Sequence, residues 1–228
     1  MWIRKGARGL LIQAHGQPGR ALSLWSIAPA RGAWPEHMSA DDTVSDEYIQ
    51  RKFRVSADGV EGWGELVLRP LAAGDERELL RIHGTPEVMR WWDLPDDAFP
   101  WDEPESTRLT IEVDGTVAGL IQFSEELEPK YRHAEIDLFL DPALHGRGVG
   151  TAAVRCVVGH LVDERGHHRI TIDPAVDNSA AVRAYEKAGF RPVGVMRRSE
   201  RDVGGGGWHD SLLMEFLAGE DAEGPSAA

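Results

Sequence analysis

The most informative part of the sequence reads Glu135-Ile-Asp-Leu-Phe-Leu-Asp-Pro-Ala-Leu-His-Gly-Arg-Gly-Val-Gly-Thr151. Its first residues predict a strand over 135–140 that ends at an Asp-Pro dipeptide, and a helix is expected over 151–165. Glycines at 146, 148 and 150 lie between the two and allow a close approach of the backbone to a ligand. The amides of the first helical turn would face that ligand with the positive end of the helix dipole behind them. This order predicts a pyrophosphate-type anion site, although it also fits an ordinary tight connection.

The flanking sequence predicts a sheet with helices on both faces. Asp114-Gly115 joins two apolar segments and is a strong hairpin signal, because both residues tolerate positive φ. Strands alone come first, and strands that alternate with helices follow, which indicates an α/β fold with a mixed sheet (α+β type). Strands are expected over 65–70, 107–113, 116–123, 135–140, 169–172, 190–196 and 208–216, and helices over 74–83, 85–92, 151–165 and 178–187.

Composition divides the chain into one domain with two appendages. Residues 1–60 are expected to be a poorly ordered N-terminal extension, of which 1–37 could be upstream or non-native sequence, because Met38 is a plausible alternative start. Residues 61–218 form the predicted domain, and the small and acidic residues of 219–228 predict a disordered tail. A net charge of −13 argues against nucleic-acid binding and suits a cationic partner, although such acidity also fits a role in solubility alone. A single cysteine and the lack of a long apolar run predict a cytoplasmic protein without membrane attachment.

A second motif, Asn178-Ser-Ala-Ala-Val-Arg-Ala-Tyr-Glu-Lys-Ala-Gly-Phe190, makes a family resemblance plain. Together with Leu144-His-Gly-Arg-Gly-Val-Gly150, it resembles the paired cofactor motifs of the GNAT acetyltransferases, over roughly residues 65–216. The resemblance implies a mostly antiparallel sheet splayed between its fourth and fifth strands, with acetyl-CoA as co-substrate and no metal. The residues that it implies in cofactor binding are Leu138, Phe139, Leu140, His145, Gly146, Arg147, Gly148, Val149, Gly150, Thr151, Asn178, Ala181, Tyr185 and Lys187. His145 is a departure, because the family usually has Gln or Arg there.

Acetyl transfer needs a proton acceptor for the amine and a donor for the departing thiolate. Tyr185 is the candidate donor, although it also fits a packed aromatic residue on a helix. Asp137 is the candidate that orients the ammonium and relays its proton, since a carboxylate of ordinary pKa is a weak base. Glu135 lies on the same strand, and it shares a face with Asp137 only if no bulge intervenes.

Among GNAT branches, the aminoglycoside 6′-N-acetyltransferases are the most similar in the order and approximate spacing of further residues. The resemblance implies that an aromatic pair walls the cleft for a small cationic aminosugar and that aspartates bind its amino groups. The residues that carry this expectation are Trp91, Trp92, Glu135, Asp137 and Asp173, and Asp210 near the last strand is a further substrate-binding candidate outside the resemblance. Their other interpretations stay open: the tryptophans as core anchors, Asp173-Pro174 as a turn, and Asp210 facing solvent. A monomer or a homodimer is expected.

Two other functions remain compatible with the sequence. The same cofactor motifs resemble those of siderophore-type acyltransferases that act on a lysine or hydroxylysine side chain, where His133 and Asp173 could flank the amine. A non-catalytic acyl-CoA-binding module would keep the fold without the chemistry, and the presence of Tyr185 and Asp137 argues against it. His133, His167 and His168 lack the spacing of a metal site.

Overall fold

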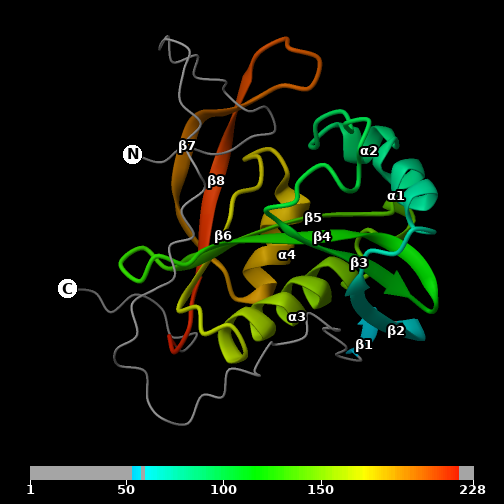
Figure 1. Cartoon of the computed structure of the whole chain (residues 1–228), viewed down its shortest axis with the longest axis horizontal. Coiled ribbons are helices and arrows are strands. Elements are labelled where there is room, and N and C mark those ends of the chain that lie inside the picture. The colour runs from blue at the N-terminus through cyan, green and yellow to red at the C-terminus, as the bar shows by residue number, and fades with distance from the viewer. Residues whose placement is uncertain (1–52, 58–59, 221–228) are drawn as a thin grey trace, which may run out of the picture. The chain divides into compact units, whose positions relative to one another are not determined.

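The computed structural model of the chain describes the backbone of residues 53–57 and 60–220, with side chains from residue 65 onward. The described elements form one mixed sheet with helices on both faces (Figure 1). In chain order they are β1 (Phe53–Ala57), β2 (Val60–Pro70), α1 (Glu76–His83), α2 (Pro86–Met89), β3 (Thr107–Val113), β4 (Thr116–Glu126), β5 (His133–Leu140), the 3-10 helix η1 (Pro142–Leu144), α3 (Val149–Asp163), β6 (Arg169–Ile172), α4 (Ser179–Ala188), β7 (Arg191–Arg201) and β8 (Trp208–Leu217).

The sheet has the strand order β1-β2-β3-β4-β5-β6-β8-β7, and only the β5–β6 pair is parallel among the described strands. These two strands pair near their starts, at Ala134 with Ile170 and at Glu135 with Thr171, and no further pairing joins them within the described residues. β5 and β6 are the fourth and fifth strands when β2, which contains residue 65, is counted as the first. The predicted fold class and the predicted splay are therefore confirmed.

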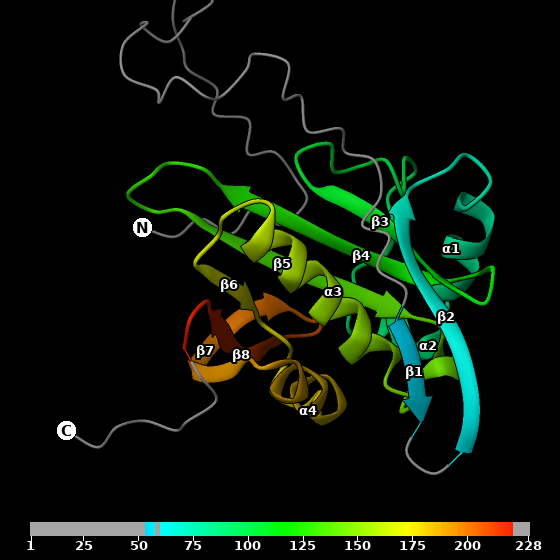
Figure 2. The same ribbon diagram turned by 90° about the horizontal axis from the view of Figure 1, so that it is seen from below.

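The helices divide between the two faces of the sheet. α1 and α2 lie on one face and α3 lies on the other, where α4 packs beside it (Figures 1 and 2). The α3 face holds the larger core, in which Ala134 and Ile136 of β5 meet Val154, Val157 and Leu161 of α3. α3 fits this position because its buried residues recur at helical spacing and cover the sheet.

A second, aromatic-rich core lies under α1 and α2. Leu79 and Ile82 of α1 pack there with Leu120 of β4 and Phe139 of β5. The register between β4 and β5 is continuous, from Gly119 opposite Leu140 to Glu126 opposite His133. Side chains of β5 therefore alternate without a bulge, and Glu135, Asp137 and Phe139 share the face that α1 and α2 cover.

The hairpin predicted at Asp114-Gly115 is present, with φ of 50° and 74° at the two residues. β7 is longer than expected, because a register shift between Met196 and Glu200 lets it continue. Arg198 has φ of 50° inside this bulge, and its amide donates to Oδ1 of Asp210 at 2.7 Å. A side chain on the partner strand thus stabilises a backbone shape that the sequence of β7 does not reveal.

β1 lies inside residues 1–60, which were expected to be an extension, and it pairs antiparallel with β2. In the sequence, the alternating residues of 53–57 and the Asp58-Gly59 dipeptide are strand and hairpin signals. The expectations for residues 1–52 and for 221–228 of the tail lie outside the described residues.

Gly119 of β4 leaves no room for a side chain against the backbone of β5. A Cβ atom at this position would lie 2.2 Å from the carbonyl oxygen of Phe139, which is backbone and cannot move aside. We expect Gly119→Ala to lower the free energy of unfolding by about 3 kcal/mol or more, as measured by denaturant titration. Gly194→Ala is the matched control on an exposed strand, since a Cβ there meets no atom within 4 Å. Equal stabilities of the two variants would contradict the prediction.

Candidate active site

The glycine turn ends at the uncapped N-terminus of α3. Gly148 is the N-cap residue, with φ of 80°, a conformation that disfavours any side chain. No side chain caps the helix, and its first turn carries no acidic residue. The first amides of a helix have no partner within the helix. This end of α3 therefore has the backbone geometry that a diphosphate site needs, and the binding itself stays a prediction.

The residues around the turn hold it in shape. Asp141 accepts a hydrogen bond from the Ala143 amide at 2.9 Å and so caps η1. A ring nitrogen of His145 lies 3.2 Å from the Leu140 carbonyl oxygen. Val149 is buried, so its backbone and not its side chain can face a ligand. The structure thus gives His145 a structural contact, and its predicted contact with the cofactor stays a prediction.

The open edge of β5 provides the second part of a cofactor site. Beyond Glu135 the strand has no described pairing on its β6 side, although its pairing with β4 continues to Leu140. Backbone groups on that edge can pair with an amide-containing chain such as pantetheine. The predicted residues Leu138, Phe139 and Leu140 lie on this part of the strand, with Phe139 and Leu140 buried in the two cores.

The two sequence motifs meet where α3 packs on α4. The Thr151 hydroxyl donates to the carbonyl of Ala184 at 3.2 Å, and Arg155 donates to the carbonyl of Lys187. Asn178 caps α4 by accepting from the Ala181 amide at 3.2 Å. The Lys187 side chain is exposed at the C-terminal end of α4. Asn178 and Thr151 thus have structural contacts, which sequence motifs alone cannot separate from ligand binding.

Tyr185 is buried on α4, and it is coupled electrostatically to two of the predicted aspartates. Burial, followed by the negative charges of Asp137 and Asp173, raises the pKa of its phenol well above the ordinary value. Asp137 is exposed on β5, and Asp173 follows directly after β6. The two strands part here, so the splay brings the phenol and both carboxylates into one neighbourhood. A phenol with a raised pKa stays protonated at neutral pH and remains a hydrogen-bond donor.

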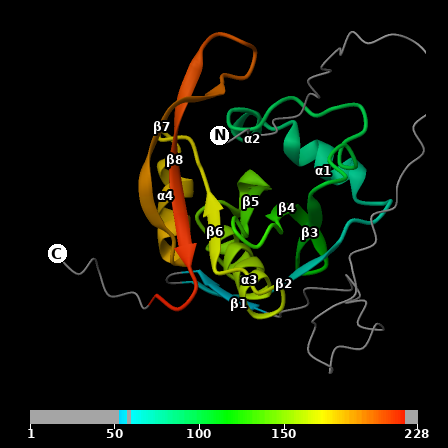
Figure 3. The same cartoon turned by 60° about the vertical axis from the view of Figure 1, so that its left-hand side comes forward.

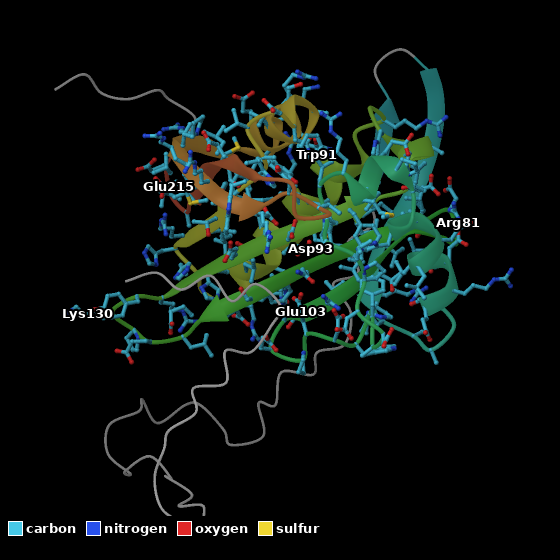
Figure 4. All side chains as sticks on the ribbon, turned by 90° about the horizontal axis from the view of Figure 1, so that it is seen from above. Arg81, Trp91, Asp93, Glu103, Lys130 and Glu215 are labelled. Atoms are coloured by element: carbon cyan, nitrogen blue, oxygen red, sulfur yellow. The ribbon has the colours of Figure 1, made fainter. Side chains whose placement is uncertain are left out.

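The two neighbouring tryptophans, Trp91 and Trp92, make different contacts. Trp92 packs edge-on against Phe139, with ring centroids 4.9 Å apart, and against His83 at 5.9 Å. It is therefore a core anchor, although it is only half-buried. The ring of Trp91 lies under the Arg90 guanidinium, 4.5 Å from its central carbon. Figure 4 looks onto this face and labels Trp91 on it. Both tryptophans thus belong to the face that carries Asp137.

The segment after β6 runs along β8. Leu212 donates to the carbonyl of Pro174 at 2.8 Å, and Val176 donates to the carbonyl of Asp210 at 2.9 Å. Asp173 and Asp210 consequently lie on adjoining segments. The Asp210 carboxylate supports the bulge at Arg198, so the structure shows a structural contact for it. Figure 3 shows the region of β5 and β6 between α2 on one side and the β7–β8 hairpin on the other.

Two residues near Asp137 were missed by sequence reasoning. Gln122 of β4 is the direct cross-strand neighbour of Asp137, and Arg108 of β3 is the neighbour of Gln122. The Arg108 Nε donates to Oε1 of Gln122 at 2.7 Å, and Arg108 is buried. An arginine in a central strand of the sheet was the available signal, because charged residues are rarely buried without partners.

His83 makes the aromatic core under α1 sensitive to acid. Burial, aided by the charge of Arg108 and opposed by Asp102, lowers the pKa of its imidazole, and its Nδ1 atom has no hydrogen-bond partner among the described residues. An unfolded histidine gains its proton as the pH falls below about 6.5, whereas folded His83 resists protonation. We therefore expect the free energy of unfolding to fall between about pH 6.5 and 5.5 more steeply than in His83→Leu. Parallel denaturant curves at these pH values test this, and identical slopes would refute it.

Comparison with known proteins agrees with this geometry. Residues 65–191, more than half of the chain, match the family model described as the acetyltransferase (GNAT) domain. The chain therefore belongs to the GNAT family of acetyltransferases. Within the part of the chain that the structure describes, no helix is long and apolar enough to cross a membrane.

The chain is similar to acetyltransferases of more than one name. The spermidine N(1)-acetyltransferase of Escherichia coli strain K12 is 27% identical over 137 residues, which cover 56% of this chain and 73% of that protein. Mycobacterium smegmatis RimJ in complex with CoA-disulfide has a TM-score of 0.60 at 22% identity, covering 70% of this chain and 85% of that one. The aminoglycoside acetyltransferase AAC(6′)-Ib in complex with coenzyme A and kanamycin has a TM-score of 0.55 at 23% identity, covering 67% and 95%. These two structures show the fold alone.

Proposed function

We propose that the chain transfers an acetyl group from acetyl-CoA to a primary amine of a small polycationic acceptor, with the 6′-amine of an aminoglycoside as the principal candidate. The observation that carries the proposal is the splay between β5 and β6, where Asp137 lies on β5, Asp173 follows β6, and Tyr185 of α4 is buried nearby. A hydrogen-bond donor and two carboxylates in one place suit the binding of an ammonium group and, once it has lost a proton, its attack on a thioester. Spermidine is the second candidate, and the relative from Escherichia coli favours it.

The fit to acetyl-CoA rests on the two features described above. The uncapped turn at Gly148 would hold the diphosphate, and the open edge of β5 would pair with the pantetheine arm. When bound, the co-substrate supplies the thioester. The surrounding net charge of −13 would attract the cationic acceptor rather than the anionic donor, so local amides have to carry the binding of the phosphates.

The residues divide the chemistry between them. Asp137 would hold the ammonium of the acceptor and relay its proton towards solvent, which leaves a neutral amine to form the new C–N bond. The C–S bond then breaks, and Tyr185 would donate a hydrogen bond to the departing sulfur. A thiolate is less basic than a phenolate of raised pKa, so Tyr185 stabilises the leaving group without losing its own proton. Asp173 would hold a second amino group of a polycationic acceptor.

A panel of acceptors tests the proposal. Release of free thiol from acetyl-CoA would be followed with kanamycin, spermidine and N6-hydroxylysine, and without acceptor. Turnover with kanamycin, together with its absence for an analogue that lacks the 6′-amine, would support the principal candidate. Turnover with spermidine alone would favour the second candidate, and turnover with hydroxylysine alone would reject both. Failure to bind coenzyme A in calorimetry would reject the family of reactions altogether.

A further inference from the structure

Arg108 is a buried cation next to the candidate active site, and each of its three guanidinium nitrogens has a partner. Nε donates to Oε1 of Gln122 at 2.7 Å, Nη1 donates to the Pro100 carbonyl at 2.8 Å and also to Asp102, and Nη2 lies 3.2 Å from Glu103. The Arg108 side chain is only 4% exposed. A fully partnered, buried guanidinium has little freedom to move, so it can set the orientation of what it contacts.

The contact with Arg108 decides which way the Gln122 carboxamide points. A guanidinium has only donors, so the atom of Gln122 that faces β3 has to be the oxygen and not the amide nitrogen. The Nε2 group is therefore turned away from Arg108, and it makes no hydrogen bond with any residue in the described part of the chain. Gln122 is half-buried and lies directly opposite Asp137 in the β4–β5 register. Two N–H donors are thus available beside the proposed ammonium site.

The same guanidinium holds the loop before β3. Pro100, Asp102 and Glu103 all contact Arg108, and the Phe99 ring lies 5.5 Å from its central carbon. Glu103 and Asp93 of this loop are both labelled in Figure 4, which views the face with α1 and α2. One residue therefore anchors both the loop and the carboxamide. Side chains of neighbouring strands on one face lie close enough for this coupling.

We propose that Gln122 is a specificity-determining residue whose amide donates to an oxygen of the acceptor beside the amine at Asp137, and that Arg108 is the positioning residue that aims it. The inference rests on the proposed function. It favours acceptors with a hydroxyl or ether oxygen close to the amine, as in an aminosugar. A polyamine offers only methylenes and charged N–H donors there, and two donors facing each other are unfavourable.

Gln122→Glu is the sharpest test, because it replaces the amide nitrogen by a carboxylate oxygen with almost no change of shape. Arg108 keeps its acceptor, so the variant is expected to fold. We expect the ratio of kcat/KM for kanamycin to kcat/KM for spermidine to fall about 10-fold or more, because the site exchanges donors for an anion. The KM for acetyl-CoA should stay unchanged. An unchanged acceptor ratio would overturn the proposal.

Arg108→Lys tests the positioning role, since lysine keeps the charge but cannot hold the carboxamide and the loop together. The acceptor ratio should fall about 5-fold in this variant, whereas in a chain that already carries Gln122→Leu the same substitution should change it no further. Calorimetric melting of each variant measures its stability separately from the acceptor ratio. A purely structural role of Arg108 would lower the melting temperature and leave the acceptor ratio unchanged. Additive effects on the ratio would overturn the positioning role. A wild-type chain that acetylates neither acceptor would overturn the proposed function and this inference together.

Discussion

Tyr185→Phe is expected to lower kcat for acetyl transfer by about 100-fold while changing the dissociation constant of acetyl-CoA by less than about twofold. The substitution keeps the ring that packs in the α3 core and removes the hydroxyl. Burial and two neighbouring carboxylates keep that hydroxyl protonated, so its loss removes a hydrogen-bond donor that acts when the C–S bond breaks. Steady-state assays of thiol release measure kcat, and calorimetry measures the binding of coenzyme A.

The control for this variant is Tyr131→Phe, because Tyr131 is 62% exposed in the loop between β4 and β5 and has no place in the site. It should leave both quantities unchanged. If Tyr185→Phe turned over at the wild-type rate, the hydroxyl would have no role in the reaction, and Tyr185 would be a packed aromatic residue of α4.

Asp137→Asn should lower kcat/KM for the amine acceptor by about 100-fold, through both KM and kcat. The amide keeps the size of the side chain but cannot balance an ammonium or relay its proton. A second readout is independent of turnover. Calorimetric binding of the acceptor in the presence of coenzyme A should weaken in this variant, because the amide no longer balances the ammonium charge.

Glu128→Gln is the matched control for Asp137→Asn, since it removes one exposed carboxylate from the loop after β4. It should leave kcat/KM within about twofold at moderate ionic strength, because exposed charges at a distance are screened. An Asp137→Asn variant with wild-type kinetics and wild-type affinity for the acceptor would show that another carboxylate holds the acceptor. Glu135 would then be the first to replace, because it shares the face of β5 with Asp137.

Local sequence was enough to predict those parts of the site that depend on backbone shape. Positive φ at Asp114-Gly115, and helix boundaries within a few residues of Gly148 and Asn178, follow from the conformational preferences of single residues. The splay between β5 and β6 was implied by a family resemblance, and the strand pairing confirms it. The roles of the individual cofactor residues stay predictions, because the same side chains also make structural hydrogen bonds, as Asn178 and Thr151 do.

The sequence alone determined the class of fold, the turn before α3 and the strand that carries Asp137, because these follow from residue preferences and from the period of apolar side chains. Only the tertiary structure decided that Asp210 supports a bulge in β7, that Trp92 packs on Phe139, and that Arg108 orients Gln122. Each of these contacts joins residues from different elements, and its energy depends on the direction of side chains and on burial. Such directions arise only when strands have found their register, so no local pattern in the chain records them.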